Sequence, residues 1–319
     1  MKSKQKLIAL SAGGNNDELA KQGIGIEHIN ELMVRFAARL LRDGHRLSFG
    51  GTLGNPNEEL TKSLIDTALV RLDDANAVDS NPLDPNTWPL VNYSGWPYYT
   101  SINAEIRASH VGICQFVEVP PENVSSEELK SLQEDWKSKP VARRRNADSL
   151  YLMRKKSAEE ADLRIVWGGK IHGGAGWMAG ILEEVACTIE AGKPLLLLGG
   201  FGGCAKLIAE FLVKKTNRWP SELNPQATSD SERENLLLPQ EKKKLMARFE
   251  KVTEDLEKYR TLLHNEKDVN GIPREALFQA LEDTSPRQVV RLGSEMGEKE
   301  LATDSGNNKK PKSGTESLE

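Results

Sequence analysis

The sequence has few cysteines, no long apolar run and no strong charge of either sign. Its three cysteines lack Cys-x-x-Cys spacing and its five histidines lack metal-ligand spacing, so we expect neither a disulfide framework nor a metal site. A net charge of −4 provides no basic field for nucleic acid. No run approaches the roughly 20 apolar residues of a membrane-spanning helix, and Leu7–Leu10 is too short for a signal peptide. We therefore expect a cytoplasmic protein with no membrane or nucleic-acid partner.

Glycine, in contrast, is placed with a clear pattern, directly after short apolar runs. The runs that begin at Leu7, Arg46, Leu163 and Pro194 are each followed by a glycine pair. Further strands are expected over Pro89–Tyr93 and Val111–Val119. Strands that alternate with helices predict an α/β fold, a doubly wound and mostly parallel Rossmann-like sheet of about six strands with a C-terminal helical appendage.

Apolar side chains at helical spacing predict the connecting helices. The Arg143-Arg144-Arg145 run is expected in a solvated loop between two of them. The expected helices cover residues 28–42, a stretch after Pro56, 125–137, 148–161, a stretch from Gly180 and a stretch after Gly203.

The character of the chain changes after Arg218, where the sequence becomes polar and contains proline. The segment Gln240–Leu263 carries one apolar stripe and predicts an amphipathic helix, which either packs on its own sheet or contacts a partner. Two shorter helices are expected over Pro273–Glu282 and Pro286–Met296. The expected organisation is a Rossmann domain over 5–218, a linker or surface loop over 219–240, a helical region over 241–297 and a disordered tail over 298–319.

Glycine turns at strand ends expose backbone N–H groups and helix N-termini, which suit phosphate groups. We therefore expect a nucleotide ligand; the alternative is that the glycines serve tight turns only. The sequence has neither a complete Gly-x-Gly-x-x-Gly fingerprint nor a P-loop. The ligand-binding candidates from these turns are Ser11, Gly13, Gly14, Gly50, Gly51, Thr52, Gly168, Gly169, Lys170, Gly180, Gly200, Phe201, Gly202 and Gly203.

Three charged residues are candidates for chemistry at the same edge. Glu183 and Glu184 lie in the first turns after Gly180, where a carboxylate either caps the helix or contacts a ribose. Arg154 is either an anion clamp or an exposed helix charge, because arginine suits bidentate phosphate contacts. Trp96, which follows an expected strand, is either a core residue or a platform for a base.

These segments resemble the SLOG superfamily, named for the DNA-processing protein Smf/DprA and the Lonely Guy (LOG) enzymes. LOG-type enzymes carry a Pro-Gly-Gly-x-Gly-Thr-x-x-Glu signature, and the segment Trp167–Gly169 resembles its start. Gly180–Glu184 resembles its end, with Glu184 at the catalytic glutamate position, and Met153–Lys155 resembles the helix that bears the catalytic arginine. About ten residues separate Gly169 from Gly180. Gly168–Lys170, Gly180–Glu184 and Gly192–Gly203 together resemble the sensor branch of the superfamily more closely.

The resemblance implies a module that binds an NAD-derived nucleotide. Sensor members stand beside TIR or sirtuin-like effector domains in bacterial defence, so a partner effector or a homo-oligomer would supply the output. The alternative function is an N-glycosidic hydrolase or phosphoribohydrolase, in which Glu184 acts at the anomeric carbon and Arg154 clamps phosphate. A third possibility is a ligand sponge or scaffold. No cofactor beyond the nucleotide is expected.

Overall fold

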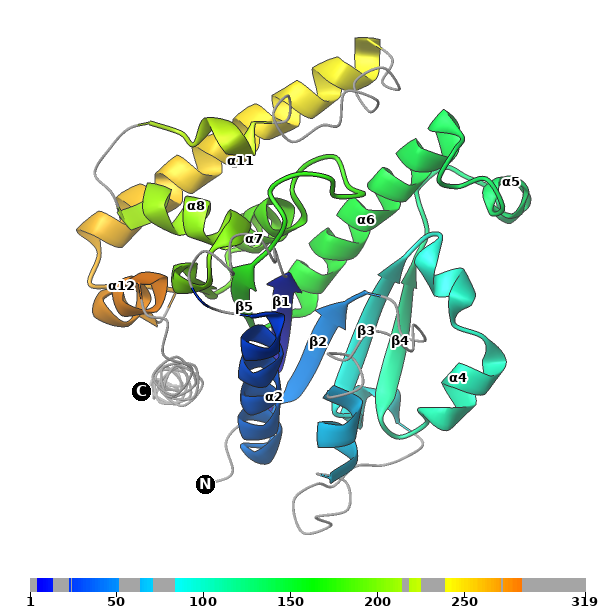
Figure 1. Ribbon diagram of the computed structural model, residues 1–319, viewed down its shortest axis with the longest axis horizontal. Coiled ribbons are helices and arrows are strands. Elements are labelled where there is room, and N and C mark those ends of the chain that lie inside the picture. The colour runs from blue at the N-terminus through cyan, green and yellow to red at the C-terminus, as the bar shows by residue number, and fades with distance from the viewer. Residues whose placement is uncertain are drawn as a thin grey trace, which may run out of the picture.

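Six parallel strands form the central sheet (Figure 1). The computed structural model describes residues 5–13, 23, 25–51, 64–70, 84–213, 218–224, 239–270 and 272–282. The strand order is β4-β3-β2-β1-β5-β6, which confirms the expected doubly wound α/β fold. The strands are β1 (Leu7–Gly13), β2 (Arg46–Gly50), β3 (Leu90–Gly95), β4 (Cys114–Val119), β5 (Leu163–Gly168) and β6 (Leu195–Leu198).

Helices connect these strands, and the C-terminal helices extend beyond β6. Residues 64–70 are also helical, within the stretch expected after Pro56. Gly14, Thr52, the helix expected over 286–296 and the tail 298–319 lie outside the described residues. The helices are α2 (Ile26–Arg42), α4 (Ala104–Ser109), α5 (Ser126–Leu132), α6 (Pro140–Glu160), α7 (Gly180–Glu190), α8 (Gly203–Val213), α11 (Pro239–Asn265) and α12 (Arg274–Glu282), and the short strands β7 (Asp268–Val269) and β8 (Ile272–Pro273) form a hairpin between the last two.

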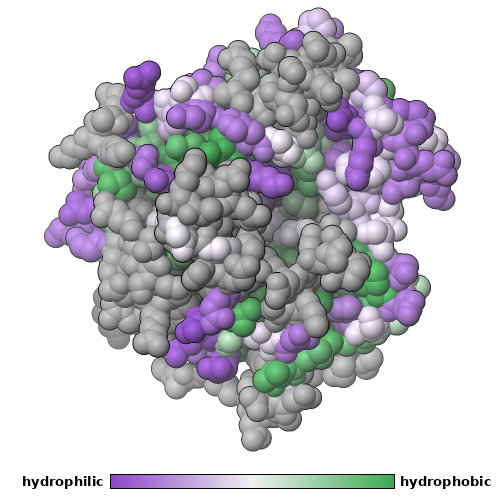
Figure 2. Space-filling model, viewed as in Figure 1, coloured by the Kyte–Doolittle hydropathy of each residue, from purple (hydrophilic) through white to green (hydrophobic). Residues whose placement is uncertain are grey.

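The three consecutive arginines are in a helix, so the expected solvated loop is wrong. They lie in the first turns of α6, which begins at Pro140, a residue suited to a first helical turn. Arg144 pairs with Glu241 of α11 (Nε–Oε1 3.0 Å), and Arg145 pairs with Glu128 of α5 (Nη2–Oε1 3.2 Å). Hydrophilic side chains cover the surface where α5 lies, at the right of the view (Figure 2). Charge density suggested a loop, whereas partners on two other helices hold Arg144 and Arg145 half-buried.

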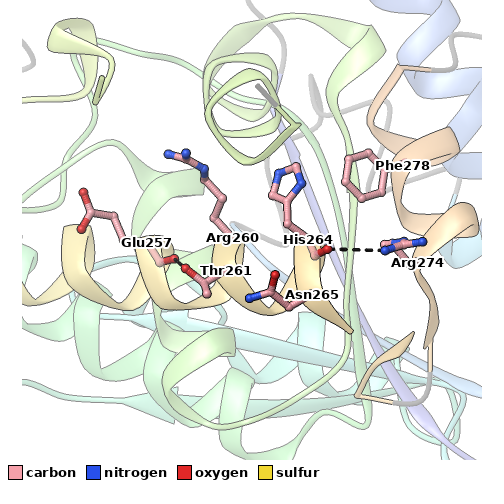
Figure 3. Close-up of a pocket in the computed structure, with 7 residues that line it drawn as sticks. All are labelled: Glu257, Arg260, Thr261, His264, Asn265, Arg274 and Phe278. Carbon is pink, nitrogen blue, oxygen red and sulfur yellow. Dashed lines mark hydrogen bonds between the residues drawn. The ribbon is translucent and has the colours of Figure 1, made fainter. Parts of the chain in front are cut away.

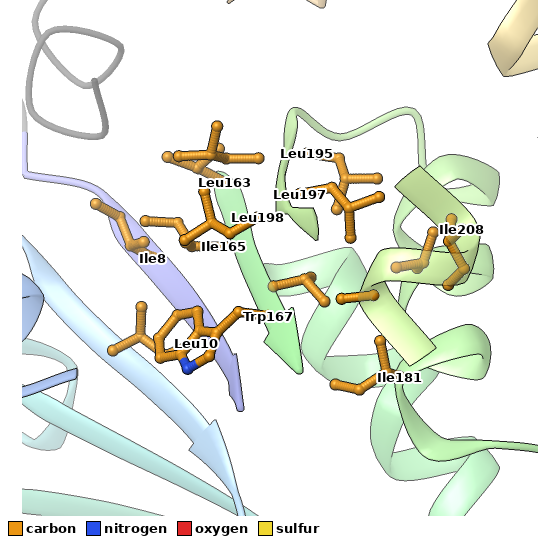
Figure 4. Close-up of a cluster of buried hydrophobic side chains, with 14 of the residues drawn as sticks. Ile8, Leu10, Leu163, Ile165, Trp167, Ile181, Leu195, Leu197, Leu198 and Ile208 are labelled. Carbon is orange, nitrogen blue, oxygen red and sulfur yellow. The ribbon is translucent and has the colours of Figure 1, made fainter. Parts of the chain in front are cut away.

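At β5 the two faces of the sheet differ in polarity. Successive side chains of a strand point to opposite faces. On β5, Trp167 packs against Phe36 of α2 (ring centres 5.9 Å apart), within the main cluster of buried apolar side chains (Figure 4). Arg164 points to the other face, where it contacts α6 and α7. A buried charge therefore lies under α6 and α7, while α2 covers an apolar face.

The connection from β4 back to β5 creates a switch point in the sheet. Strands β1 to β4 follow one another toward one side of the sheet, whereas β5 and β6 lie on the other side of β1. In such sheets the connections on the two sides of the switch point leave a crevice outside the carboxyl ends of the strands. Gly13 of β1 and Gly168 of β5 are paired in register there. The carboxyl edge of β1 and β5 is therefore the expected position of a ligand site in this sheet.

Helix α11 packs its apolar stripe against α7 and α8 of the same chain. The buried residues of the stripe are Phe249, Val252, Leu256, Tyr259 and Leu263.

Part of the stretch expected to be a linker or surface loop also packs on the domain. Leu223 is buried, and the ring of Trp219 lies 5.1 Å from that of Phe211 and 5.6 Å from that of Phe249.

None of the helices in the described part of the chain has both the length and the apolar composition that a membrane-spanning segment requires.

Candidate functional site

Glycines from three turns meet at the switch point. The N–H of Gly169 donates to the carbonyl of Gly13 (2.7 Å), and the N–H of Cys204 donates to the carbonyl of Gly169 (2.9 Å). A methyl group added at Gly13 would lie 2.7 Å from the Cα of Gly169. Gly203 has a φ of +63°, and a methyl group there would also contact the backbone of Gly168. The turns after β1, β5 and β6 thus pack directly on one another, which only glycine permits.

The glycines that end β2 have more open surroundings. Gly51 is exposed, has a φ of +127°, and has no heavy atom within 4 Å of the position a Cβ would take. The side-chain amide of Asn92 donates to the backbone carbonyl oxygen of Gly51 (3.2 Å). At Gly50 an added methyl group would lie 3.3 Å from the Cε of Met153. Gly51 therefore offers its backbone at the sheet edge, next to the helix that carries Arg154.

The structure brings Arg154, Glu183 and Glu184 together. A guanidinium nitrogen of Arg154 donates to the carboxylate of Glu183, and its Nε lies 3.7 Å from Oε1 of Glu184. The backbone of the loop before α7 covers this guanidinium, since a methyl group at Gly176 would lie 2.5 Å from Nη1 and one at Gly180 would lie 3.0 Å from Nη2. Arg154 is therefore neither an exposed helix charge nor an open anion clamp in this conformation.

Two further arginines complete the charged cluster. Arg164 of β5 donates to Ser11 (2.7 Å) and to Ser157 (3.0 Å), and its Nη1 lies 3.5 Å from Glu184. Arg248 of α11 lies 2.9 Å from Oε1 of Glu183, with its Cζ 3.1 Å from the ring centre of Tyr151. We call Arg154, Arg164, Arg248, Glu183 and Glu184 the charge network.

The chain matches one family model over residues 2–272, and that model is described as SLOG cluster2. This protein belongs to the SLOG cluster2 family. A comparison with curated proteins found no match.

Two of the three segments that carry the resemblance to SLOG proteins begin at the switch-point edge, and the third reaches it only at its end, where Gly203 packs on Gly168. Gly168–Lys170 ends β5, Gly180–Glu184 opens α7, and Gly192–Gly203 spans β6 and its following turn. Lys170 is exposed, while Phe201 is 2 % exposed and belongs to the core, and Gly202 has a φ of +78°. Gly200 lies in a 3-10 turn directly after β6. The segment Gly180–Glu184 thus contributes both glutamates of the charge network.

The charge network of this SLOG protein has three arginines and two glutamates. Burial lowers the pKa of Arg154, but Glu183 and Glu184 outweigh that effect and raise it overall. Burial also lowers the pKa of Arg164, which Glu184 partly offsets. Arginine stays protonated in proteins. The network therefore carries one more positive than negative charge, close to the end of a helix that favours anions.

The cysteines of the SLOG protein are unsuited to nucleophilic chemistry. All three are buried, and burial raises the pKa of Cys114, Cys187 and Cys204 to about 12. The thiolate is the reactive form, and at neutral pH these groups remain thiols.

The sequence patterns did not single out Arg164 or Arg248 as site residues. A signal for Arg164 existed, because it is the one charged residue in the apolar strand Leu163–Gly168. A charge in such a strand is buried and needs partners. Arg248 had no comparable signal, since it is one of many charged residues on the amphipathic helix α11. Trp96 is 1 % exposed, so it is a core residue and not a platform for a base.

Proposed function

We propose that this SLOG protein binds an NAD-derived or other ADP-ribose-like nucleotide as a sensor module. The observation that carries the proposal is the position of the charge network. It lies beneath the first turns of α7, next to the switch point between β1 and β5, and its five side chains together carry an excess of one positive charge. Phosphate groups are the anions that such an edge of a parallel sheet holds.

The two glutamates have different roles in this proposal. Glu183 has no exposed side-chain area and is held by Arg154 and Arg248, so it organises the cluster. The side chain of Glu184 is 17 % exposed. In the proposed complex its carboxylate accepts a hydrogen bond from a ribose hydroxyl. Lys170 and Arg154 pair with phosphate, and the backbone at Gly51 allows close approach. Because the loop before α7 covers Arg154, its contact with phosphate requires that loop to move.

A sensor of this kind needs a partner for its output. The apolar stripe of α11 is covered by α7 and α8 of the same chain, so that stripe does not provide the partner surface. We propose that a homo-oligomer or a separate effector protein, as in bacterial antiphage defence, reads the bound nucleotide. Sedimentation measurements with and without nucleotide test whether binding changes the assembly.

A nucleotide panel tests the binding proposal. AMP, NAD, ADP-ribose and cyclic ADP-ribose isomers are added while thermal unfolding is followed, and each ligand is recovered for mass analysis. A ligand at about 100 times its Kd stabilises the folded state by about 2.7 kcal/mol, which is a readily measured rise in Tm. Stabilisation by an intact nucleotide supports the sensor. No shift with any nucleotide would contradict the proposal.

The position of Glu184 between two arginines also favours a second function, a LOG-like nucleotide N-glycosidase. In that function Glu184 stabilises the charge that develops at the anomeric carbon. Glu184→Gln is then expected to remove turnover, by about 100-fold or more, with little change in affinity. If the protein is a sensor, Glu184→Gln weakens its affinity for the nucleotide. Neither the unchanged protein nor the variant then releases free base. Glu190→Gln, in the same helix and paired with Lys251 on the surface, is the control and should leave both quantities unchanged.

A further inference from the structure

The loop before α7, residues 169–179, is held at both ends and crosses over Arg154 in between. At its start the backbone of Gly169 packs in the glycine turns of the switch point. At its end Met178 is 3 % exposed and belongs to the main apolar cluster. Between these ends Ala175–Trp177 lies against α6, and we call this segment the strap. Movement of the loop is therefore confined to the strap and the residues just before it.

The strap contacts α6 through three successive residues. Ala175 packs on the smaller apolar cluster, which lies between β3, β4 and α6. A methyl group added at Gly176 would lie 2.5 Å from Nη1 of Arg154, so the backbone there covers the guanidinium. The indole N–H of Trp177 donates to a carboxylate oxygen of Asp148 on α6 (2.9 Å). One directional side-chain contact thus fixes the strap beside the arginine that it covers.

The carboxyl group of Asp148 is well suited to hold the strap. Burial raises its pKa, whereas the hydrogen bond from Trp177 and the nearby charge of Arg145 lower it. The contact with the strap therefore favours the carboxylate, and a hydrogen bond to a carboxylate is stronger than one between neutral groups.

A hinge for the strap is present directly before it. Gly173 is exposed, has a φ of +71°, and has no heavy atom within 4 Å of the position a Cβ would take. Glycine adopts left-handed and right-handed conformations with similar ease, so the backbone at this residue can change direction at low cost.

We propose that the strap is a gate, latched by the hydrogen bond from Trp177 to Asp148, and that its opening exposes Arg154 to an anionic ligand. The inference rests on the function proposed above for the identity of that ligand, a nucleotide phosphate. While the gate is closed, Arg154 does not contribute to binding, so the apparent Kd exceeds the intrinsic Kd by the reciprocal of the open fraction. Weakening the latch is therefore expected to tighten binding.

Modification of arginine by phenylglyoxal, located by mass analysis of peptides, measures the opening without any ligand. Arg164 is 3 % exposed and reports on loosening of the whole domain. Arg274 borders the hollow between the last turns of α11 and the start of α12, and its side chain is 37 % exposed, so it gives the rate of an accessible arginine (Figure 3). In the unchanged protein Arg154 is expected to react much more slowly than Arg274.

Two variants remove the two sides of the latch. Trp177→Phe removes the donor, and Asp148→Leu removes the acceptor. Each is expected to raise the rate at Arg154 about tenfold, since loss of a hydrogen bond to a carboxylate changes the open fraction by about that factor. The double variant is expected to react no faster than either single variant, because both changes break the same hydrogen bond.

Glu159→Leu is the matched control. Glu159 also lies on α6, but it pairs with Lys155 on the surface (3.9 Å), and the two side chains are 55 % and 47 % exposed. The rate at Arg154 is expected to stay unchanged in this variant. Circular dichroism checks that all variants are folded.

Three results would overturn the gate. One is an unchanged rate at Arg154 in both single variants. Another is an equal rise at Arg164, which indicates a loosened domain. The third is an additive effect in the double variant, which indicates that the two residues act separately.

ADP-ribose then tests the ligand in Trp177→Phe. Protection of Arg154 from modification, with a lower Kd than in the unchanged protein, supports both the gate and the proposed function. Faster modification of Arg154 that ADP-ribose does not slow confirms the gate and contradicts the proposed ligand.

Discussion

Arg154→Met is expected to lower the free energy of unfolding by about 3–5 kcal/mol, because it leaves buried carboxylates without their main partner. Glu183 has no exposed side-chain area, and Arg154 is the residue that contacts both Glu183 and Glu184. Methionine fills a similar volume, so the loss reports the charge and its hydrogen bonds more than the packing. Chemical denaturation followed by circular dichroism measures it.

Arg35→Met is the control for this prediction. Arg35 also pairs with a glutamate, Glu31, but the two side chains are 49 % and 57 % exposed. Exposed pairs of this kind contribute about 1 kcal/mol or less. If Arg154→Met destabilises the protein no more than Arg35→Met does, the charge network does not stabilise the fold, and the organising role proposed for Glu183 is wrong.

Gly203→Ala is expected to lower the free energy of unfolding by more than about 4 kcal/mol, enough to prevent folding in a marginally stable protein. The added methyl group would lie 2.9 Å from the carbonyl carbon of Gly168 and closer still to the carbonyl oxygen of Gly169. These are backbone atoms of the switch-point turns, which cannot rotate away. The yield of folded protein and its unfolding midpoint measure the effect.

Gly192→Ala separates this steric effect from the cost of the backbone conformation. Gly192 has a φ of +65°, close to the +63° of Gly203, and no heavy atom lies within 4 Å of the added methyl position. Only the left-handed conformation then costs free energy, about 1–2 kcal/mol. Equal losses in Gly192→Ala and Gly203→Ala would show that the three turns do not pack as tightly as described.

Much of the sheet follows from local patterns in the sequence. The runs at Leu7–Leu10 and Arg46–Phe49 were expected as strands and lie within β1 and β2. A buried parallel strand needs apolar side chains on both faces, and the turn after it needs glycine, so the signal is complete within a few residues. The apolar stripe of α11 was predicted for the same reason.

The patterns failed where a residue's surroundings come from distant parts of the chain. The arginine run at 143–145 has the composition of a loop, and its helical state depends on contacts with α5 and α11. Glu183 and Glu184 were two neighbouring candidates with the same two interpretations. In the structure Glu183 is fully buried and pairs with Arg248 from another helix, whereas Glu184 stays partly exposed.

The class of fold, the positions of the glycine turns and the family could be predicted without coordinates, because each depends on local spacing or on short motifs. The contacts that those residues make depend on the packing of the whole chain. It placed Gly13, Gly169 and Gly203 against one another, and it buried Arg154 beneath the loop before α7. A strand or turn is specified by neighbours in the chain, whereas a buried charge is specified by partners that only the packing of β1, β5, α6, α7 and α11 brings within reach.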